Sequence, residues 1–199
     1  KTPDLLTECQ TIIPAQRNEI ADGMREMKQQ GFVIEHLQIE NQLLQIDKEL
    51  GTYRAFLENA EEDEVESGLQ EIKEKIDVFY DLLEKEVNAK HYVLQENEKI
   101  GFILDQLQGV NNDIKAETDL IQNSYQLLDN EIEVPRDFEE NLSDLIRRYE
   151  LLEAKIGENK SAYSLLNEEL KVIESQLTDL QSEQAQFSEK LQNLRKDEL

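Results

Sequence analysis

Residues 138–199 read FEENLSDLIRRYELLEAKIGENKSAYSLLNEELKVIESQLTDLQSEQAQFSEKLQNLRKDEL, and the spacing of their apolar side chains decides the fold. These side chains recur in alternating steps of three and four residues. The series, in which only Asn159 and Gln184 are polar, is Leu142, Leu145, Tyr149, Leu152, Ile156, Asn159, Tyr163, Leu166, Leu170, Ile173, Leu177, Leu180, Gln184, Phe187, Leu191 and Leu194. Because an α-helix turns once per 3.6 residues, this spacing places one narrow apolar stripe, here called the seam, along one helix face. No proline interrupts it, which predicts one continuous helix packed against other helices as in a coiled coil.

The composition of the 199-residue chain is that of long helices. Charged residues make up 33% of the chain, aromatic residues 6%, and there are only seven glycines and three prolines. The net charge of −24 disfavours direct binding to nucleic acid or to anionic lipid. This charge is typical of solvated helix faces, and it is also compatible with a surface that binds basic segments of a partner. No apolar run is long enough to cross a membrane.

Three further helices are expected before residue 138, over about 3–29, 35–59 and 63–128. Pro14 lies inside the first and should bend or restart it. Gly31 is placed to end the first helix, and residues 32–34 form a short apolar crossing. Residues 130–136, with Pro135, are the only clear loop expected in the second half. From residue 87 to 103 the apolar side chains are spread around the third helix.

The short connections predict antiparallel neighbours and an all-α fold of elongated, spectrin-like repeats, in which antiparallel three-helix bundles share long continuous helices. Residues 1–95 are expected to form one three-helix repeat. Residues 96–199 are expected to form a second, incomplete repeat, in which the third helix continues and the long fourth helix returns along it. The second half of that fourth helix needs cover, either from the third helix or from a partner.

Residues suited to catalysis or metal binding are scarce. The residues three positions before His36 and His91 are Val33 and Asn88, so neither histidine belongs to the Glu-x-x-His pair of a di-metal helical bundle. Cys9 stands alone at helical spacing from core positions and is expected to be a small core residue. No glycine-rich phosphate loop is present. The sequence therefore predicts no enzyme, no catalytic residue, no cofactor and no metal site. The sequence also predicts no exposed cluster of apolar side chains away from the seams.

Two segments, EMKQQGFVIEHL at 26–37 and IDVFYDLLEKEVNAKH at 76–91, resemble the EzrA family of septation ring formation regulators from low-GC Gram-positive bacteria. The terminal LRKDEL at 194–199 is similar too. This resemblance implies an internal fragment of a cytoplasmic, spectrin-like region that an N-terminal transmembrane helix, absent from this segment, anchors to the membrane. It also implies a location on the cytoplasmic face of the membrane at the division septum.

The function that the resemblance implies is cell-division control. Members bind the tubulin-like protein FtsZ, restrain its ring and scaffold other division proteins. The segment lacks the family's glutamine–asparagine–arginine patch, so its own contact with FtsZ is an open question. The alternative is a passive coiled-coil spacer or tether without direct FtsZ contact, with self-association as a further possibility. No functional residue is carried over from the family.

Overall fold

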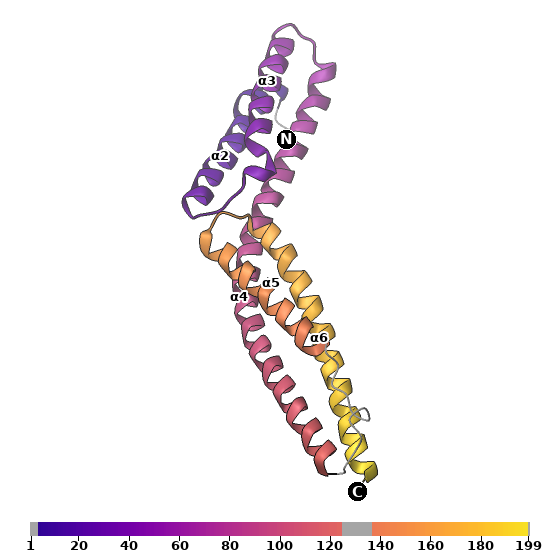
Figure 1. The fold of residues 1–199 in the computed structure, drawn as a ribbon. Coiled ribbons are helices and arrows are strands. Elements are labelled where there is room, and N and C mark those ends of the chain that lie inside the picture. Colours follow the sequence, from indigo (N-terminus) through magenta and orange to yellow (C-terminus); the bar gives the residue numbers. More distant parts are fainter. Residues whose placement is uncertain (1–3, 125–136, 199) are drawn as a thin grey trace. The chain divides into compact units, whose positions relative to one another are not determined.

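The computed structural model describes residues 4–124 and 137–198, which form helices and short connections and contain no β-strand. Figure 1 shows the long helices in chain order. The elements are α1 (Leu5–Thr7), the π-helical turn η1 (Glu8–Ile12), α2 (Ile13–Gln29), the 3₁₀ turn η2 (Glu35–Leu37), α3 (Ile39–Glu58), α4 (Asp63–Ser124), α5 (Asp137–Glu158) and α6 (Tyr163–Glu198). The all-α fold class expected from the seams is confirmed. The expected loop at 130–136 and the expected end of the third helix lie outside the described residues.

The chain divides into two compact units. Unit 1 comprises Lys1–Lys90 and Asn159–Ser164, and unit 2 comprises His91–Glu158 and Leu165–Leu199. Helix α4 contributes its first half to unit 1 and its second half to unit 2. Each unit is described separately below.

Unit 1 begins with a helical segment that changes its winding before Pro14. The π-helical turn η1 precedes α2, and Pro14 occupies the first turn of α2, where a missing backbone N–H costs little. The helical backbone is continuous through Pro14, and the expected bend or restart is replaced by a change to π-helical winding just before it. Within this turn Glu8 is buried, and the Nζ of Lys73 on α4 donates to its carboxylate at 2.5 Å.

The α2 helix ends in a Schellman motif at Gly31. The N–H of Phe32 donates to the carbonyl of Met27 at 3.0 Å, and the N–H of Gly31 donates to that of Lys28 at 3.1 Å. Gly31 has φ = 92°, a conformation that favours glycine. The expected cap is therefore confirmed. The chain then crosses with Phe32 and Ile34 buried before it enters η2 and α3.

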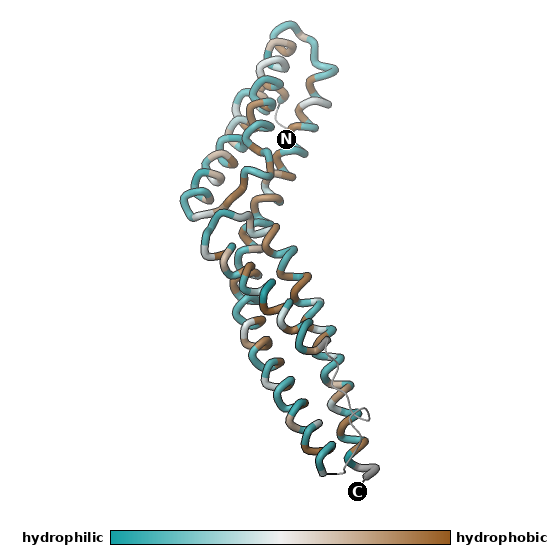
Figure 2. Tube along the Cα trace, viewed as in Figure 1, coloured by the Kyte–Doolittle hydropathy of each residue, from teal (hydrophilic) through white to brown (hydrophobic). Residues whose placement is uncertain are grey.

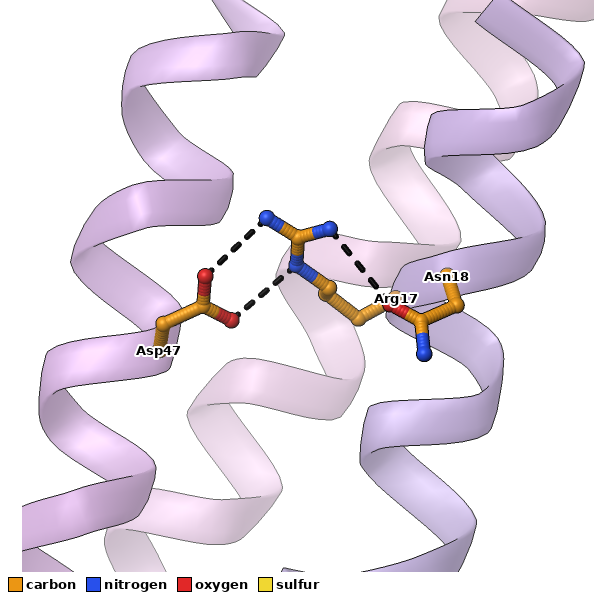
Figure 3. A network of polar contacts seen from close by, with 3 residues as sticks. All are labelled: Arg17, Asn18 and Asp47. Carbon is orange, nitrogen blue, oxygen red and sulfur yellow. Dashed lines mark hydrogen bonds and ion pairs between the residues drawn. The ribbon is translucent and has the colours of Figure 1, made fainter.

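An arginine–carboxylate pair joins α2 to α3 (Figure 3). The Nε and Nη2 of Arg17 donate to the two carboxylate oxygens of Asp47, each at 3.0 Å. Arg17 also donates to the side-chain oxygen of Asn18 at 3.4 Å. Such a two-point pair fixes direction as well as distance. A second pair, between Lys28 and Glu40 at 2.5 Å, joins the same helices and shows that they run antiparallel.

The described residues of unit 2 form three helical segments, namely the second half of α4, α5 and most of α6. The hydroxyl of Tyr149 on α5 donates to the carbonyl of Asn97 at 3.2 Å, whereas Lys115 pairs with Glu139, so α4 and α5 run antiparallel. The Tyr92–Glu174 and Arg195–Glu117 contacts show that α4 and α6 run parallel.

The expectation of one continuous fourth helix is wrong. Helix α5 ends at Glu158 and α6 begins at Tyr163. Between them Asn159, a seam position, adopts a left-handed conformation with φ = 57°, which asparagine tolerates better than most residues. The chain reverses direction between α5 and α6, yet the three-and-four spacing continues across the loop. Each helix has a seam of its own, and the length of the loop keeps the two seams in the same spacing. Gly157, Asn159 and Ser161 were the overlooked loop signal.

The buried side chains follow the predicted seams closely. Figure 2 shows hydrophobic residues recurring along each helix between hydrophilic ones. On α6, Leu166, Leu170, Ile173, Leu177, Leu180 and Leu191 are buried, and α4 supplies the expected cover, since the side-chain amide of Gln184 reaches the carbonyl of Leu107. The apolar side chains between residues 87 and 103 are spread around α4 as expected, since Val93 and Ile100 are buried whereas Tyr92, Leu94 and Phe102 are exposed. A line of buried positions nevertheless continues along the helix as Glu86, Ala89, Val93, Ile100 and Leu104.

Candidate functional site

Among the side chains in the described part of the chain, no group of three His, Cys, Asp or Glu residues is arranged to hold a metal ion. Cys9 is fully buried, and its thiol lies 3.3 Å from the carbonyl oxygen of Leu50, to which it donates. Burial raises the pKa of the Cys9 thiol, which disfavours the reactive thiolate. Cys9 therefore occupies the core position expected from its spacing.

The most connected polar site in unit 1 surrounds Glu86, a carboxylate that is only 1% exposed. The backbone N–H of Ser164, in the first turn of α6, donates to one Glu86 oxygen at 3.2 Å, and the Nε2 of His36 lies 3.3 Å from the other. The hydroxyl of Ser164 lies 3.4 Å from the same histidine nitrogen. These three residues are here called the Glu86 cluster, in which Ser164 lies 78 residues from Glu86 and 128 residues from His36 in the chain.

Two aromatic rings and a lysine lie beside this cluster. Phe32 and Tyr163 pack edge to face with their ring centroids 5.7 Å apart. The Nζ of Lys90, one helical turn after Glu86, lies 4.9 Å from the Phe32 centroid and 5.8 Å from that of Tyr163. A cation above an aromatic face is stabilised by the ring quadrupole. Because Glu86 is only 1% exposed, its carboxylate depends on its protein partners.

The Glu86 cluster combines the residue types of a Ser-His-Glu triad without its geometry. A triad needs the serine on one ring nitrogen of the histidine and the carboxylate on the other. Here both Ser164 and Glu86 face Nε2. The arrangement instead caps a helix. The carboxylate accepts a free N–H at the start of α6, where negative charge is favourable.

Sequence reasoning missed the cluster because glutamates were read as solvated surface. The overlooked signal was position: Glu86 lies seven residues after Phe79 and seven before Val93, and both of these are buried. A carboxylate at a seam position requires partners, since an unpaired buried charge is costly. The partners themselves, from η2 and from the start of α6, depended on the chain reversal that the sequence reading did not include.

A second buried polar site lies in unit 2 between α4 and α6. The side-chain N–H of Gln184 donates to the side-chain oxygen of Asn111 and, at 3.3 Å, to the carbonyl of Leu107. Asn111 in turn donates to the carbonyl of Phe138 at 3.3 Å. A buried amide among apolar seam positions is a known means of fixing the register between helices.

Replacing Asn111 alone with leucine should therefore destabilise unit 2 by about 1–3 kcal/mol, because Gln184 and the Phe138 carbonyl each lose a partner. Replacing both Asn111 and Gln184 with leucine should restore much of this stability, since two apolar groups can match a satisfied polar pair. Urea unfolding of the two variants measures the difference. A double variant as unstable as Asn111→Leu alone would argue against a paired role.

Tyr149 is a tyrosine whose hydroxyl is held against α4. A Cβ added to Gly101 would lie 2.5 Å from the Tyr149 Oη, so the absence of a side chain at position 101 makes room for the hydroxyl. Burial, followed by the nearby Glu153 carboxylate, raises the pKa of Tyr149 to about 12. The ring fills the seam position that its spacing predicted.

This shift predicts alkaline instability in unit 2. The neutral phenol is favoured in the folded state, so its contribution to stability is complete below pH 10 and is lost as the pH rises towards 12. Urea unfolding at pH 9 and pH 11 should show a smaller loss in Tyr149→Phe than in the unsubstituted chain. Equal losses in the two proteins would show that other groups cause the alkaline dependence.

The sequence predicts no exposed apolar cluster away from the seams, and individual apolar side chains are exposed there. Large hydrophobic residues are exposed outside them, and in unit 2 they include Tyr92, Leu94, Phe102, Leu120, Leu151, Leu165 and Val172. Phe102 is 66% exposed on α4. Single exposed apolar residues are ordinary, whereas neighbouring ones mark interaction surfaces.

The described residues thus define an all-helical protein whose buried polar groups join helices to one another, as in structural and regulatory helical proteins. None of the helices in the described ranges is both long and apolar enough to span a membrane. The family model described as "Septation ring formation regulator, EzrA" matches residues 1–199. The chain belongs to this family, which is named for regulation.

Curated relatives carry the same description. The chain is 41% identical to the septation ring formation regulator EzrA of Geobacillus sp. (strain WCH70), over 88% of this chain and 31% of the relative. It is 38% identical to the Bacillus velezensis protein, over 96% of this chain and 34% of the relative, and 29% identical to the Listeria welshimeri protein, over 100% and 35%. The chain therefore spans about a third of the length of these relatives. No solved structure matches it.

Proposed function

We propose that the chain is a helical segment of a cell-division regulator that restrains assembly of the FtsZ ring and scaffolds other division proteins. The observation that supports this proposal is the family match over residues 1–199. The chain spans about a third of the length of the curated relatives it matches. A part for this segment in the activity of the whole protein is therefore a proposal.

The segment would act at the division septum, on the cytoplasmic face of the membrane, and unit 1 and unit 2 would each be a spectrin-like repeat. The support for the repeats is the helix arrangement inside each unit, where neighbouring helices in the chain run antiparallel. The proposed partners are FtsZ and other division proteins.

A spacer role without direct FtsZ contact is the second candidate. It is favoured by the polar sites described above, because the Glu86 cluster and the Asn111–Gln184 pair are both used within the fold. Such a segment would hold partner-binding regions at a fixed separation.

Polymer co-sedimentation tests the proposal. A full-length relative such as the Geobacillus protein should lower the amount of FtsZ that pellets with GTP, and excising the region that matches residues 1–199 should weaken this effect. The 199-residue chain is then added alone. Restraint by the isolated chain would establish direct action, whereas restraint lost on excision but absent from the isolated chain would favour the spacer. An unchanged effect after excision would contradict both roles.

A further inference from the structure

A groove in unit 2 runs between α5 and α6. It encloses about 270 Å³, and buried Leu145 and Leu180 contribute to its lining. Three carboxylates, Asp144, Asp179 and Glu183, also line the groove, together with one cation, Arg148. The groove is acidic at its edges and apolar at its base.

Farther along the same two helices, an ion pair also joins α5 to α6. The Nζ of Lys155 on α5 donates to Glu169 on α6 at 2.7 Å. Leu151 lies three residues after Arg148 and four before Lys155. Val172 lies three residues after Glu169 and four before Gln176, which also lines the groove. Because residues three and four apart share a helix face, Leu151 and Val172 lie between the groove and the ion pair.

Both of these apolar side chains are largely exposed to solvent. Leu151 is 59% exposed and Val172 is 49% exposed, and neither belongs to the seam of its helix. Leu165, seven residues before Val172 on the same face, is also 49% exposed. The α5/α6 surface, defined here by Leu151, Val172 and the groove beside them, therefore joins exposed apolar area to an acidic rim.

We propose that the α5/α6 surface binds a basic amphipathic helix of a partner protein. Apolar side chains at three- and four-residue spacing would cover Leu151 and Val172, and flanking lysines and arginines would approach Asp179 and Glu183, since Asp144 is paired with Arg147 at 3.4 Å. The charge of the whole chain, −24, would draw such a segment in and repel an acidic one. Nucleic acid and anionic membranes carry the wrong sign for this surface.

The binding should be modest in strength and sensitive to salt. The apolar centre consists of a few side chains, so the contact falls at the small end of protein interfaces. The carboxylates at its rim are exposed, and attraction between exposed charges weakens as salt shortens the Debye length to about 10 Å at 0.1 M. The apolar centre should supply the position-specific part of the affinity.

The test uses the 199-residue chain and a fluorescein-labelled helical peptide of about 18 residues, with leucine on one face and lysine and arginine on the other. Fluorescence polarisation at low salt should show binding, and Leu151→Ser should weaken it at least about tenfold. Leu44→Ser on α3 is the matched control, because Leu44 is 57% exposed and lies in unit 1. This control should bind as the unsubstituted chain does.

A second pair of variants tests the rim. The double substitution Asp179→Lys and Glu183→Lys should weaken binding, whereas Glu74→Lys with Asp77→Lys, which makes the same change in net charge on exposed positions of unit 1, should have a smaller effect. The proposal is overturned if the chain does not bind the peptide at low salt, or if Leu151→Ser and Leu44→Ser behave alike. It is also overturned if a peptide with serine in place of leucine binds equally well, since general acidity would then explain the binding.

Discussion

Glu86→Ala should destabilise unit 1 by about 2–4 kcal/mol. The substitution removes the acceptor for the Ser164 N–H, at a cost of about 1–3 kcal/mol for a buried group without a partner. It also leaves a cavity at a position that is 1% exposed. The contact with His36 is lost as well. The measurement is the shift in the urea midpoint of helical circular dichroism.

Two controls isolate the carboxylate's role. Glu84→Ala makes the same change at an exposed position two residues away and should cost less than about 0.5 kcal/mol. Glu86→Gln keeps an oxygen that can accept from Ser164, so it should cost less than Glu86→Ala. If Glu84→Ala and Glu86→Ala were equally harmful, the Glu86 cluster would contribute nothing specific to the fold.

The seams were predictable because burial and helical period are both local properties of the sequence. The apolar positions of α6, from Leu166 to Leu191, are buried where the three-and-four spacing placed them. The Gly31 cap was predictable for a similar reason, since few residues other than glycine accept φ near 92°. Such features need only the residues on one helix.

The reversal of chain direction between α5 and α6 was harder to predict from the sequence. A seam defines which face of a helix is buried, and it says nothing about chain direction. Antiparallel helices that pack in one unit can keep the same step across a short loop, so Asn159 looked like a polar exception in a long helix. Its left-handed backbone identifies it as the end of α5.

The Glu86 cluster and the α5/α6 surface both depend on that reversal. Ser164 contacts Glu86 only because α6 begins at Tyr163, and Leu151 and Val172 share one surface only because α5 and α6 run antiparallel. A single continuous helix would have placed Leu151 and Val172 on the same helix about 30 Å apart, at 1.5 Å per residue. Without the loop between α5 and α6, neither the Glu86 cluster nor the α5/α6 surface can be predicted from the sequence.

Leu170→Ala should be among the most damaging single substitutions in unit 2. Leu170 is 0% exposed in the middle of the α6 seam, so truncation removes buried methyl groups and leaves a cavity, which costs about 2–5 kcal/mol. Leu165→Ala removes the same atoms from a half-exposed position of the same helix and should cost less than half as much. Glu169→Ala breaks only the exposed pair with Lys155 and should cost under about 1 kcal/mol. Urea unfolding of the three variants gives the order of their free energies of unfolding. If Leu165→Ala destabilised the chain as much as Leu170→Ala, the buried face of α6 would be assigned incorrectly.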